Sequence, residues 1–213
     1  REQCGALWFD DLGCGSHAAA VPPRAQLGDA DSARQLRPAR GHAGHKGGYG
    51  DVIAVGGAPG MSGALTLAAR AALIAGAGRV FACALDPDMP THDALAPELM
   101  WRRALWHDDP SALRDATVVC GCGGGNAVRE PLPVLLSRSA RLVLDADALN
   151  AIAADTALQS LLTARASRGL ATVLTPHPLE AARLLALPDA TRVQGNRLAA
   201  AQSLAQRFDC TVL

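Results

Sequence analysis

Short apolar runs alternate with longer amphipathic stretches from about residue 50 to the end of the chain. The apolar runs are rich in valine, leucine and alanine, which is typical of strands buried on both faces. We therefore predict strands at residues 52–55, 80–85, 117–120, 141–144 and 171–174, with a sixth strand beginning at Cys210.

Helices are predicted in the stretches between these strands. Their positions are residues 62–75, 128–137 and 148–154, a helix after Pro178, and residues 192–207. Glycines at positions 76 and 78 end the first helix, because glycine readily takes the conformation that stops a helix. Strands that alternate with helices predict βαβ units, and so a parallel α/β sheet covered on both faces.

Residues 1–44 differ from the rest of the chain. They are rich in turn-forming residues and show no regular periodicity, so we expect a linker with a short structured remnant around residues 7–9. The chain also begins with Arg1 instead of methionine, which suggests that it was cut from a longer protein. We place the boundary of the main domain, residues 45–213, at this point.

Composition narrows the possible functions. The 213 residues are 49% hydrophobic and 19% charged, which indicates a globular chain. The formal net charge of zero argues against a nucleic-acid or polybasic membrane surface, and no apolar run reaches the roughly 20 residues that span a bilayer. The six cysteines show no disulfide framework spacing, so we expect buried thiols in a cytoplasmic protein.

Glycine and polar residues follow four of the predicted strands. In parallel sheets, ligands bind beyond the carboxyl ends of the strands, so these residues should converge on one edge. The four segments are residues 56–63, 121–125, 145–150 and 175–177.

The glycines allow two interpretations. Gly63 and Ala64 open a helix, where small residues suit either a bound phosphate or ribose, or close helix–strand packing. The run at residues 121–125 is too dense in glycine for an ordinary strand exit, and we favour a backbone that closely approaches a ligand. Lys46 could be a basic clamp for an anionic ligand or part of an unstructured approach to the first strand.

The carboxylates and the histidine are the other candidates. One of Asp145 and Asp147 should cap the following helix, which leaves the second free for a substrate hydroxyl or magnesium-bound water. A lone histidine is more often structural than catalytic, but the prolines on both sides of His177 fix its backbone and weaken the structural interpretation. Glu180 could complement the helix dipole or orient a hydrated magnesium ion.

Taken together, these motifs resemble the ADP/ATP-dependent NAD(P)H-hydrate dehydratases of the ribokinase-like superfamily. The resemblance runs from about residue 45 to the end, with order and spacing kept. Cys4 to Gly13 also look like the tail of an epimerase domain that precedes this domain in bifunctional bacterial proteins. The matching runs are residues 45–50, 55–57, 63–64, 68–72, 76–78, 97–100, 121–125, 145–150 and 175–177, with Glu180 and Arg197.

The resemblance implies a three-layer α/β/α sandwich with a mostly parallel sheet. It also implies that the S form of NADH hydrate or NADPH hydrate is dehydrated with ADP or ATP as co-substrate and Mg²⁺, in a chain that assembles as a homo-oligomer, often a tetramer. Phosphorylation of the ring hydroxyl and elimination of phosphate would be the two steps. The residues that would contact the hydrate or shape its pocket are Ala64, Gly123 or Gly125, His177, Asp147 and Asn150.

By the same resemblance, Lys46 and Gly63 would bind the cofactor, and Glu180 would help to hold the magnesium shell. Two departures matter. Cys122 and Gly124 replace the proline and leucine of the family's Gly-Pro-Gly-Leu-Gly loop, so the loop should be less rigid. The family's Lys-Gly stretch and its Gly-x-Gly-Asp motif, with the general-base aspartate, would lie beyond Leu213.

A chain that lacks those motifs should be weakly active or inactive, and its exposed sheet edge should make it poorly soluble or dependent on partner subunits. Two alternatives remain open. One is a vitamin-precursor kinase of the same superfamily, and the other is a non-catalytic fragment that retains a dinucleotide pocket. A continuation with the two missing motifs would favour an enzyme, and a stop codon after Leu213 would favour the binder.

Overall fold

The computed structural model describes residues 10, 12–14, 28, 30–35, 42–89 and 91–213. The chain divides into two units, residues 1–42 and residues 43–213. The described part of the first unit contains the short helix α2 (Ala30–Gln35). The remnant predicted around residues 7–9 lies outside the described residues.

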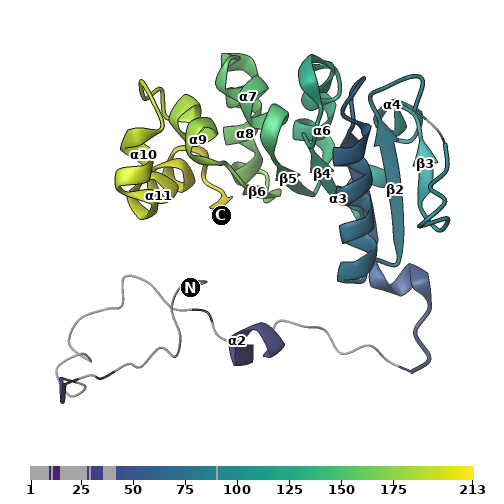
Figure 1. Ribbon diagram of the computed structural model, residues 1–213, viewed down its shortest axis with the longest axis horizontal. Coiled ribbons are helices and arrows are strands. Elements are labelled where there is room, and N and C mark those ends of the chain that lie inside the picture. Colours follow the sequence, from purple (N-terminus) through teal and green to yellow (C-terminus); the bar gives the residue numbers. More distant parts are fainter. Residues whose placement is uncertain (1–9, 11, 15–27, 29, 36–41, 90) are drawn as a thin grey trace. The chain divides into compact units, whose positions relative to one another are not determined.

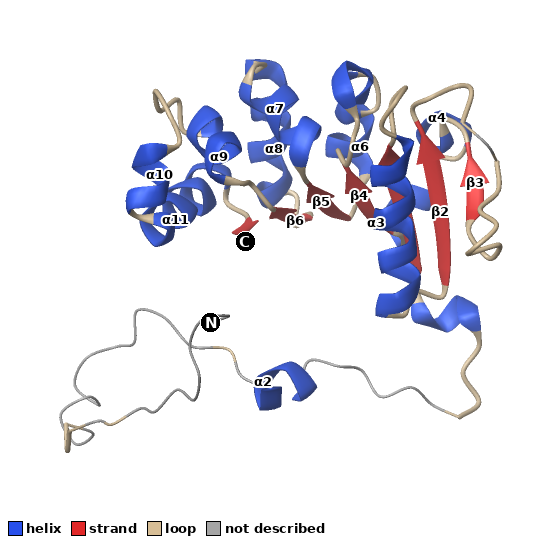
Figure 2. Cartoon of the chain, in the orientation of Figure 1, coloured by secondary structure: helices blue, strands red, loops and turns tan. Residues whose placement is uncertain are grey.

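A seven-stranded sheet forms the centre of the second unit (Figures 1 and 2). Every pair of neighbouring strands is parallel, and the strand order is β3-β2-β1-β4-β5-β6-β7. The strands are β1 (Asp51–Gly56), β2 (Arg79–Ala84), β3 (Met100–Arg102), β4 (Thr117–Cys120), β5 (Arg141–Leu144), β6 (Ala171–Leu174) and β7 (Thr211–Val212).

Helices connect most of these strands, as expected for parallel neighbours that need crossover connections, whereas no helix is described between β2 and β3. The longest is α3, which follows β1 and ends at Gly76 in the left-handed conformation. The helices of the second unit are α3 (Ser62–Ala75), α4 (Leu105–Asp108), α5 (Ala112–Asp115), α6 (Leu132–Arg138), α7 (Ala146–Ala153), α8 (Thr156–Ser167), α9 (Pro178–Leu184), α10 (Thr191–Gly195) and α11 (Arg197–Phe208), with 3-10 turns η1 (Lys46–Tyr49) and η2 (Gly125–Arg129).

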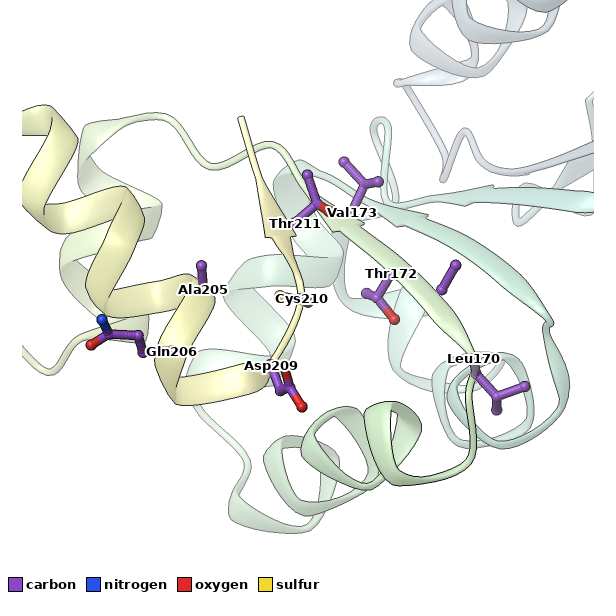
Figure 3. Close-up of a pocket in the computed structure, with 9 residues that line it drawn as sticks. Leu170, Thr172, Val173, Ala205, Gln206, Asp209, Cys210 and Thr211 are labelled. Carbon is purple, nitrogen blue, oxygen red and sulfur yellow. The ribbon is translucent and has the colours of Figure 1, made fainter. Parts of the chain in front are cut away.

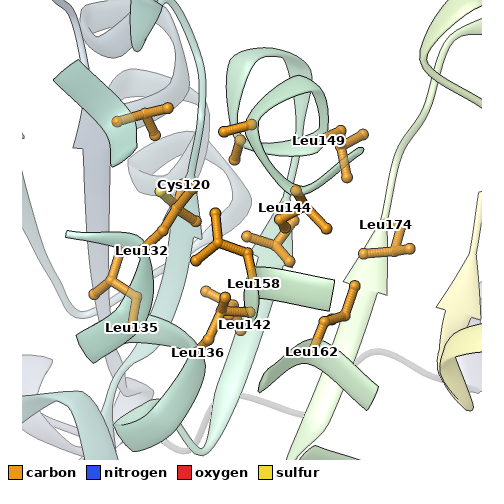
Figure 4. Packing of buried hydrophobic residues seen from close by; sticks show 14 of the residues in the cluster. Cys120, Leu132, Leu135, Leu136, Leu142, Leu144, Leu149, Leu158, Leu162 and Leu174 are labelled. Carbon is orange, nitrogen blue, oxygen red and sulfur yellow. The ribbon is translucent and has the colours of Figure 1, made fainter. Parts of the chain in front are cut away.

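The two faces of the sheet carry separate cores. On the first face, alternate strand residues such as Val118, Leu142 and Leu174 are buried under the leucines of α6 and α8 (Figure 4). On the second face, Ala54 and the alternate residues of β2 pack under α3. This arrangement confirms the predicted α/β class with helices on both faces of a parallel sheet.

Most predicted strands lie where the sequence placed them, because buried parallel strands appear as continuous apolar runs. The edge strand β3 was missed, since three residues are too few to form such a run. The helix predicted at residues 192–207 is in fact two helices, because Asn196 leaves the helical conformation and its side chain caps α11. Likewise, Pro131 separates η2 from α6 within the helix predicted at residues 128–137.

Helix α8 was also missed, although it packs against the centre of the sheet. Its buried positions are Leu158, Leu162 and Arg165, so a charged residue occupies one of the three places that define its buried face. An apolar pattern interrupted in this way carries little helical signal. Asp155 caps the helix by accepting hydrogen bonds from the backbone N–H groups of Ala157 and Leu158.

Candidate functional site at the carboxyl edge of the sheet

The four loops predicted to converge do share one edge of the sheet. They follow β1, β4, β5 and β6, which are adjacent in the sheet and parallel, so their carboxyl ends point the same way. The convergence predicted from the sequence is therefore confirmed. We call this set of loops, residues 56–63, 121–125, 145–150 and 175–180, the edge loops.

Backbone hydrogen bonds join the first two edge loops. The N–H groups of Gly57 and Ala58 donate to the carbonyls of Cys122 and Gly123, at 3.0 and 2.7 Å. These bonds continue the pairing of β1 with β4 beyond the ends of the strands. The loop after β4 is thereby held against the start of α3.

Side chains extend the same connection to the other two loops. Asp147 Oδ2 accepts a hydrogen bond from the backbone N–H of Gly125 at 2.8 Å. Asp145 Oδ1 accepts one from Thr175 Oγ1, also at 2.8 Å. An unbroken series of hydrogen bonds thus runs across the edge from the loop after β1 to the loop after β6.

The dense glycines of the loop after β4 are required by this packing. Gly121 has φ of 124°, and a Cβ atom there would lie 1.9 Å from the carbonyl oxygen of Asp145. At Gly123, with φ of 60°, a Cβ atom would lie 2.8 Å from the Met61 carbonyl and 2.9 Å from Ala64 Cβ. These contacts between loops already require glycine at Gly121 and Gly123, and the close approach of a ligand to this loop stays a prediction.

The start of α3 lies beside this loop. Its N-cap position, Met61, makes no side-chain capping bond, and the first turn carries no acidic residue. Gly63 is exposed, and a Cβ atom at this position would meet nothing within 4 Å. An uncapped helix N-terminus with an open approach suits an anionic group, because its N–H groups and the helix dipole both favour negative charge.

The two aspartates do not behave as expected. Asp145 occupies the N-cap position of α7, yet its side chain makes no capping hydrogen bond. Its carboxylate instead accepts from Thr175, and that of Asp147 accepts from Gly125. The expectation that one aspartate caps the helix while the other stays free was therefore wrong, because each carboxylate accepts a hydrogen bond from another loop.

Asn150 connects two helices at the same edge. Its side-chain oxygen accepts a hydrogen bond of 2.6 Å from Arg183 Nη1, which joins α7 to α9. Sequence reasoning did not select Arg183. Of the 20 basic residues only Lys46 is a lysine, so arginine is the ordinary basic residue of this chain and its presence carried no signal.

His177 and Glu180 form a capping box at the start of α9. The Nδ1 atom of His177 accepts from the backbone N–H groups of Leu179 and Glu180, both at 3.2 Å. In return, Glu180 Oε2 accepts from the backbone N–H of His177 at 3.0 Å. Because Nδ1 is an acceptor, the neutral imidazole carries its proton on Nε2, and that ring is 59% exposed.

Glu180 lies in the first turn of α9, where its charge complements the helix dipole as one of the two interpretations expected, and its role toward magnesium stays a prediction. The Glu180 carboxylate is buried and lies 3.6 Å from His177 Nε2. Among the described residues, no group of three or more His, Cys, Asp or Glu side chains could hold a metal ion.

Cys122 stands where the sequence resemblance leads us to expect a proline. Burial and the nearby Asp145 carboxylate both raise the pKa of its thiol, so it stays protonated at neutral pH. Its Sγ atom lies 3.8 Å from Asp145 Oδ2. The cysteine therefore acts as a weak donor inside the loop. The described cysteines, Cys14, Cys83, Cys120, Cys122 and Cys210, are all free thiols.

Lys46 does not join the other candidates. It begins the turn η1 that precedes β1, and a Cβ atom at Gly78, just before β2, would lie 1.6 Å from its carbonyl oxygen. The turn η1 and the contact with Gly78 both lie at the amino edge of the sheet. The edge loops lie at the opposite end of the six-residue strand β1, which is about 20 Å away at 3.3 Å per residue.

The all-parallel sheet with flanking helices defines an α/β protein, and comparison with solved structures shows that this fold is ribokinase-like. A solved structure of a ribokinase-like superfamily protein from Enterococcus faecalis has a TM-score of 0.62 at 21% identity and covers 82% of this chain and 60% of its own. The family model of the NAD(P)H-hydrate dehydratases matches residues 52–213. The chain therefore belongs to the NAD(P)H-hydrate dehydratase family.

Individual relatives agree with this assignment. The ADP-dependent (S)-NAD(P)H-hydrate dehydratase of Neisseria meningitidis is 39% identical over 179 residues, which are 82% of this chain and 58% of the relative. The bifunctional NAD(P)H-hydrate repair enzyme of Coxiella burnetii is 34% identical over 210 residues, 96% of this chain and 41% of the relative. This chain thus spans between two fifths and three fifths of those two relatives.

Proposed function

We propose that the protein of which this chain is part dehydrates the S form of NADH hydrate or NADPH hydrate back to the reduced dinucleotide. The observation that carries the proposal is the connection of the four edge loops through Gly125–Asp147 and Asp145–Thr175. It brings the residues that match the family motifs to one edge of the sheet. Family membership supplies the reaction.

Each edge residue has a proposed role that follows from its contacts. Ala64 leaves room above the loop after β4, whose backbone at Gly123 or Gly125 lies against the hydrated ring. The exposed Nε2–H of His177 donates a hydrogen bond to the substrate, since Nδ1 is held as an acceptor by the helix. Asp147 and Asn150 hold the pocket walls through their bonds to Gly125 and Arg183.

The nucleotide co-substrate is also part of the proposal. The uncapped start of α3, with Gly63 in its first turn, would favour a phosphate group of the dinucleotide or of ADP or ATP. Bound magnesium would neutralise phosphate charge, with Glu180 orienting a water of its shell. The phosphate-binding Lys-Gly stretch and the general-base aspartate are expected outside these 213 residues, as is a homo-oligomeric, tetrameric assembly in the cytoplasm.

We further propose that residues 1–44 are a linker and the remnant of a preceding epimerase-type domain. The bifunctional enzyme of Coxiella burnetii supports this, because its similarity covers 96% of the chain and therefore most of these residues.

The direct test is an assay of hydrated NADH and NADPH with ADP or ATP and magnesium. Recovery of the reduced-nicotinamide absorbance should require nucleotide, and it should occur in a chain extended to the length of the relatives. The 213-residue chain itself should convert little or no hydrate. Absence of nucleotide-dependent conversion in the extended chain would contradict the proposed function.

His177 offers a matched pair of variants within that assay. His177→Asn keeps a side chain that caps helices well and removes the imidazole donor, whereas His177→Ala removes both. Both variants should lose about tenfold or more in kcat/KM through the lost hydrogen bond. Only His177→Ala should also lower stability, by about 1 kcal/mol. Full activity of His177→Asn would exclude the proposed donor role.

A further inference from the structure

The start of helix α7 lies between the two loops that the proposed substrate should contact. Strand β5 stands between β4 and β6 in the sheet, so the loop after β5 separates the loop at Gly125 from the loop at His177. Helix α7 accordingly packs against η2 and against α9 (Figure 1). A ring that contacts both Gly125 and His177 therefore lies over the first turns of α7.

A separate cavity lies at the other end of the strands. It is lined by β6 and by the residues that lead into β7, including Thr172, Asp209 and Cys210 (Figure 3). Parallel sheets bind their ligands beyond the carboxyl ends of the strands, and this cavity opens near the amino ends. The groups that face the proposed substrate are therefore to be found on the edge loops.

Two polar side chains of α7 each have one bonded atom and one open atom. Asp147 Oδ2 accepts from the backbone N–H of Gly125 at 2.8 Å, and Asn150 Oδ1 accepts from Arg183 Nη1 at 2.6 Å. Within residues 42–89 and 91–213, Asp147 Oδ1 and Asn150 Nδ2 have no hydrogen-bond partner, and neither belongs to the buried unpaired polar atoms. Both atoms are therefore accessible to a ligand.

The bonded atoms determine what the open atoms offer. A backbone N–H group and a guanidinium can only donate, so each of them occupies an acceptor oxygen. Asp147 is left with a carboxylate oxygen, which accepts, and Asn150 is left with its NH₂ group, which donates. Arg183 thus fixes the orientation of the Asn150 amide, because the reversed amide would place a donor against a donor.

The two open atoms can reach the same ligand group. Residues three apart on a helix surface have Cβ atoms about 5–6 Å apart. The neighbouring residues Ala148, Leu149 and Ala151 are buried, so Asp147 and Asn150 share the accessible side of α7. An acceptor beside a donor is the complement of a primary amide, whose NH₂ group donates and whose carbonyl oxygen accepts.

We propose that Asp147 and Asn150 recognise the carboxamide of the nicotinamide ring. Asp147 Oδ1 accepts from the carboxamide NH₂ group, and Asn150 Nδ2 donates to the carboxamide oxygen. Gly125 and Arg183 are positioning residues, because they fix which atoms face the ring. This inference rests on the proposed function, since the dinucleotide is what brings a carboxamide to this edge. The carboxamide and the ring hydroxyl stand on opposite ring carbons, so this anchor turns the hydroxyl away from α7.

An adenine base offers a similar edge. Its amino group donates and its ring nitrogen N7 accepts, so the adenine of the dinucleotide or of ADP or ATP shares this chemistry. The nicotinamide is favoured here because its ring is the part that should contact Gly125 and His177, on the two sides of α7. The test separates the two groups by changing the carboxamide alone.

The test measures binding and needs no turnover. The affinity of the 213-residue chain for NADH, the proposed product, is compared by calorimetry with its affinity for reduced 3-acetylpyridine adenine dinucleotide. The analogue has a methyl group in place of the carboxamide NH₂ group, and it keeps the carbonyl and the adenine. The chain should bind the analogue about tenfold more weakly, because the Asp147 carboxylate loses its donor.

Variants assign each contact. Asp147→Asn keeps an oxygen for Gly125 and turns an NH₂ group toward the ring, so it should weaken NADH binding about tenfold and abolish the preference for NADH over the analogue. Asn150→Asp keeps the contact with Arg183 and should weaken both ligands equally, since both carry the carbonyl. Asp115→Asn, at an exposed residue of α5, removes a charge elsewhere and should bind like the wild type.

Arg183 is tested by restoring its hydrogen bond. Arg183→Met should weaken NADH and the analogue alike, by roughly three- to tenfold, because the Asn150 amide is then free to turn its oxygen toward the ring. Arg183→Lys keeps a side chain that can only donate and should recover most of the affinity. Thermal unfolding of each variant checks that it is folded, and Arg183 is exposed, so its variants should melt near the wild type.

Three outcomes would overturn the inference. The first is no binding of NADH by the folded chain, and the second is equal affinity of the wild type for NADH and the analogue. The third is an Asp147→Asn variant that keeps its preference for NADH but binds ADP more weakly, which would assign the adenine to this edge. Conversion of the hydrate by the extended chain together with equal binding of the two ligands would reject only the carboxamide contact. The expected binding without any conversion would reject only the proposed reaction.

Discussion

Single residues at the carboxyl edge are constrained mainly by one another. Gly121 lies against the carbonyl of Asp145, and Gly123 lies against Met61 and Ala64. In the sequence these glycines signalled a ligand, because a run of glycines is costly without a reason. The structure supplies a different reason, which is the interlocking of adjacent loops.

Gly121→Ala should therefore destabilise the protein by about 3 kcal/mol, because the new methyl group meets a backbone oxygen at an unfavourable φ. Gly63→Ala is the matched control. At Gly63 the space is open and the residue is helical, so the substitution should stabilise by about 0.5–1 kcal/mol. Urea unfolding of both variants measures the difference, and equal stabilities would contradict the packing argument.

Individual side chains also show where sequence reasoning was insufficient. Asp145 follows a strand and precedes a helix, which is the usual setting of an N-cap residue. Thr175, 30 positions later, competes for the same carboxylate and binds it at 2.8 Å. A local pattern cannot reveal a partner that only the sheet brings near.

At the scale of elements, one buried arginine joins three of them. Arg165 of α8 is 1% exposed and donates hydrogen bonds to Thr172 Oγ1, to the Leu136 carbonyl and to the Ala171 carbonyl. Leu136 lies in the last turn of α6, so its carbonyl accepts no hydrogen bond from within that helix. Burial lowers the pKa of Arg165 to about 10, so it remains charged at neutral pH.

Arg165→Met should destabilise the protein by about 3 kcal/mol, because the buried Leu136 carbonyl and the buried Thr172 hydroxyl lose their donor. The replacement is similar in length and apolar, so the loss is assigned to hydrogen bonds and not to a cavity. Arg168→Met, at an exposed residue one turn away in sequence, should change stability by less than about 0.5 kcal/mol. Thermal unfolding compares the two, and a neutral Arg165→Met would refute this role.

A second connection between elements depends on pH. The Arg70 guanidinium of α3 forms two hydrogen bonds with Asp93, at 2.7 and 2.6 Å, and holds the loop that follows β2. These bonds lower the pKa of Asp93 from 3.8 to about 2. A carboxylate whose pKa is lower in the folded than in the unfolded state stabilises the fold at pH values above its unfolded pKa. That contribution is lost as the pH falls toward its folded pKa.

The melting temperatures of the wild type and Arg70→Met should therefore differ most above a pH of about 4, and the difference should shrink as the pH falls toward 2. Arg114→Met, at an exposed residue of α5, should show no such pH-dependent difference. Melting curves over this range measure the effect. A constant difference across the range would indicate that packing, and not the ion pair, was lost.

At the scale of the whole molecule, the inner strands of the sheet are held by more hydrogen-bonded neighbours than its edges. Strands β2, β1, β4, β5 and β6 have strand neighbours on both sides, whereas β7 is a two-residue strand at one edge of the described sheet. None of the described helices is long and apolar enough to cross a membrane. Strand β1 contributes residues to the cores on both faces of the sheet and is therefore enclosed on both sides.

Amide hydrogen exchange should therefore be slowest in β1 and β4, which open only when the whole domain unfolds, and fastest in β7. The expected separation is at least a hundredfold in protection, because an edge strand frays locally. Peptide-resolved exchange on the 213-residue chain measures it. Equal protection of β7 and β4 would mean that another chain already covers the edge.

The sequence by itself determined most of the strands and their alternation with helices, the parallel sheet and the edge at which its loops meet, although it missed β3 and α8. Those features follow from local apolar periodicity and from the short connections of βαβ units, which are visible along one chain. The tertiary structure alone decided that Asp145 binds Thr175, that Gly121 is needed beside Asp145, and that Arg165 is buried. Each of these depends on contacts between segments that lie far apart in the sequence or on different elements, and only the folded sheet brings them together.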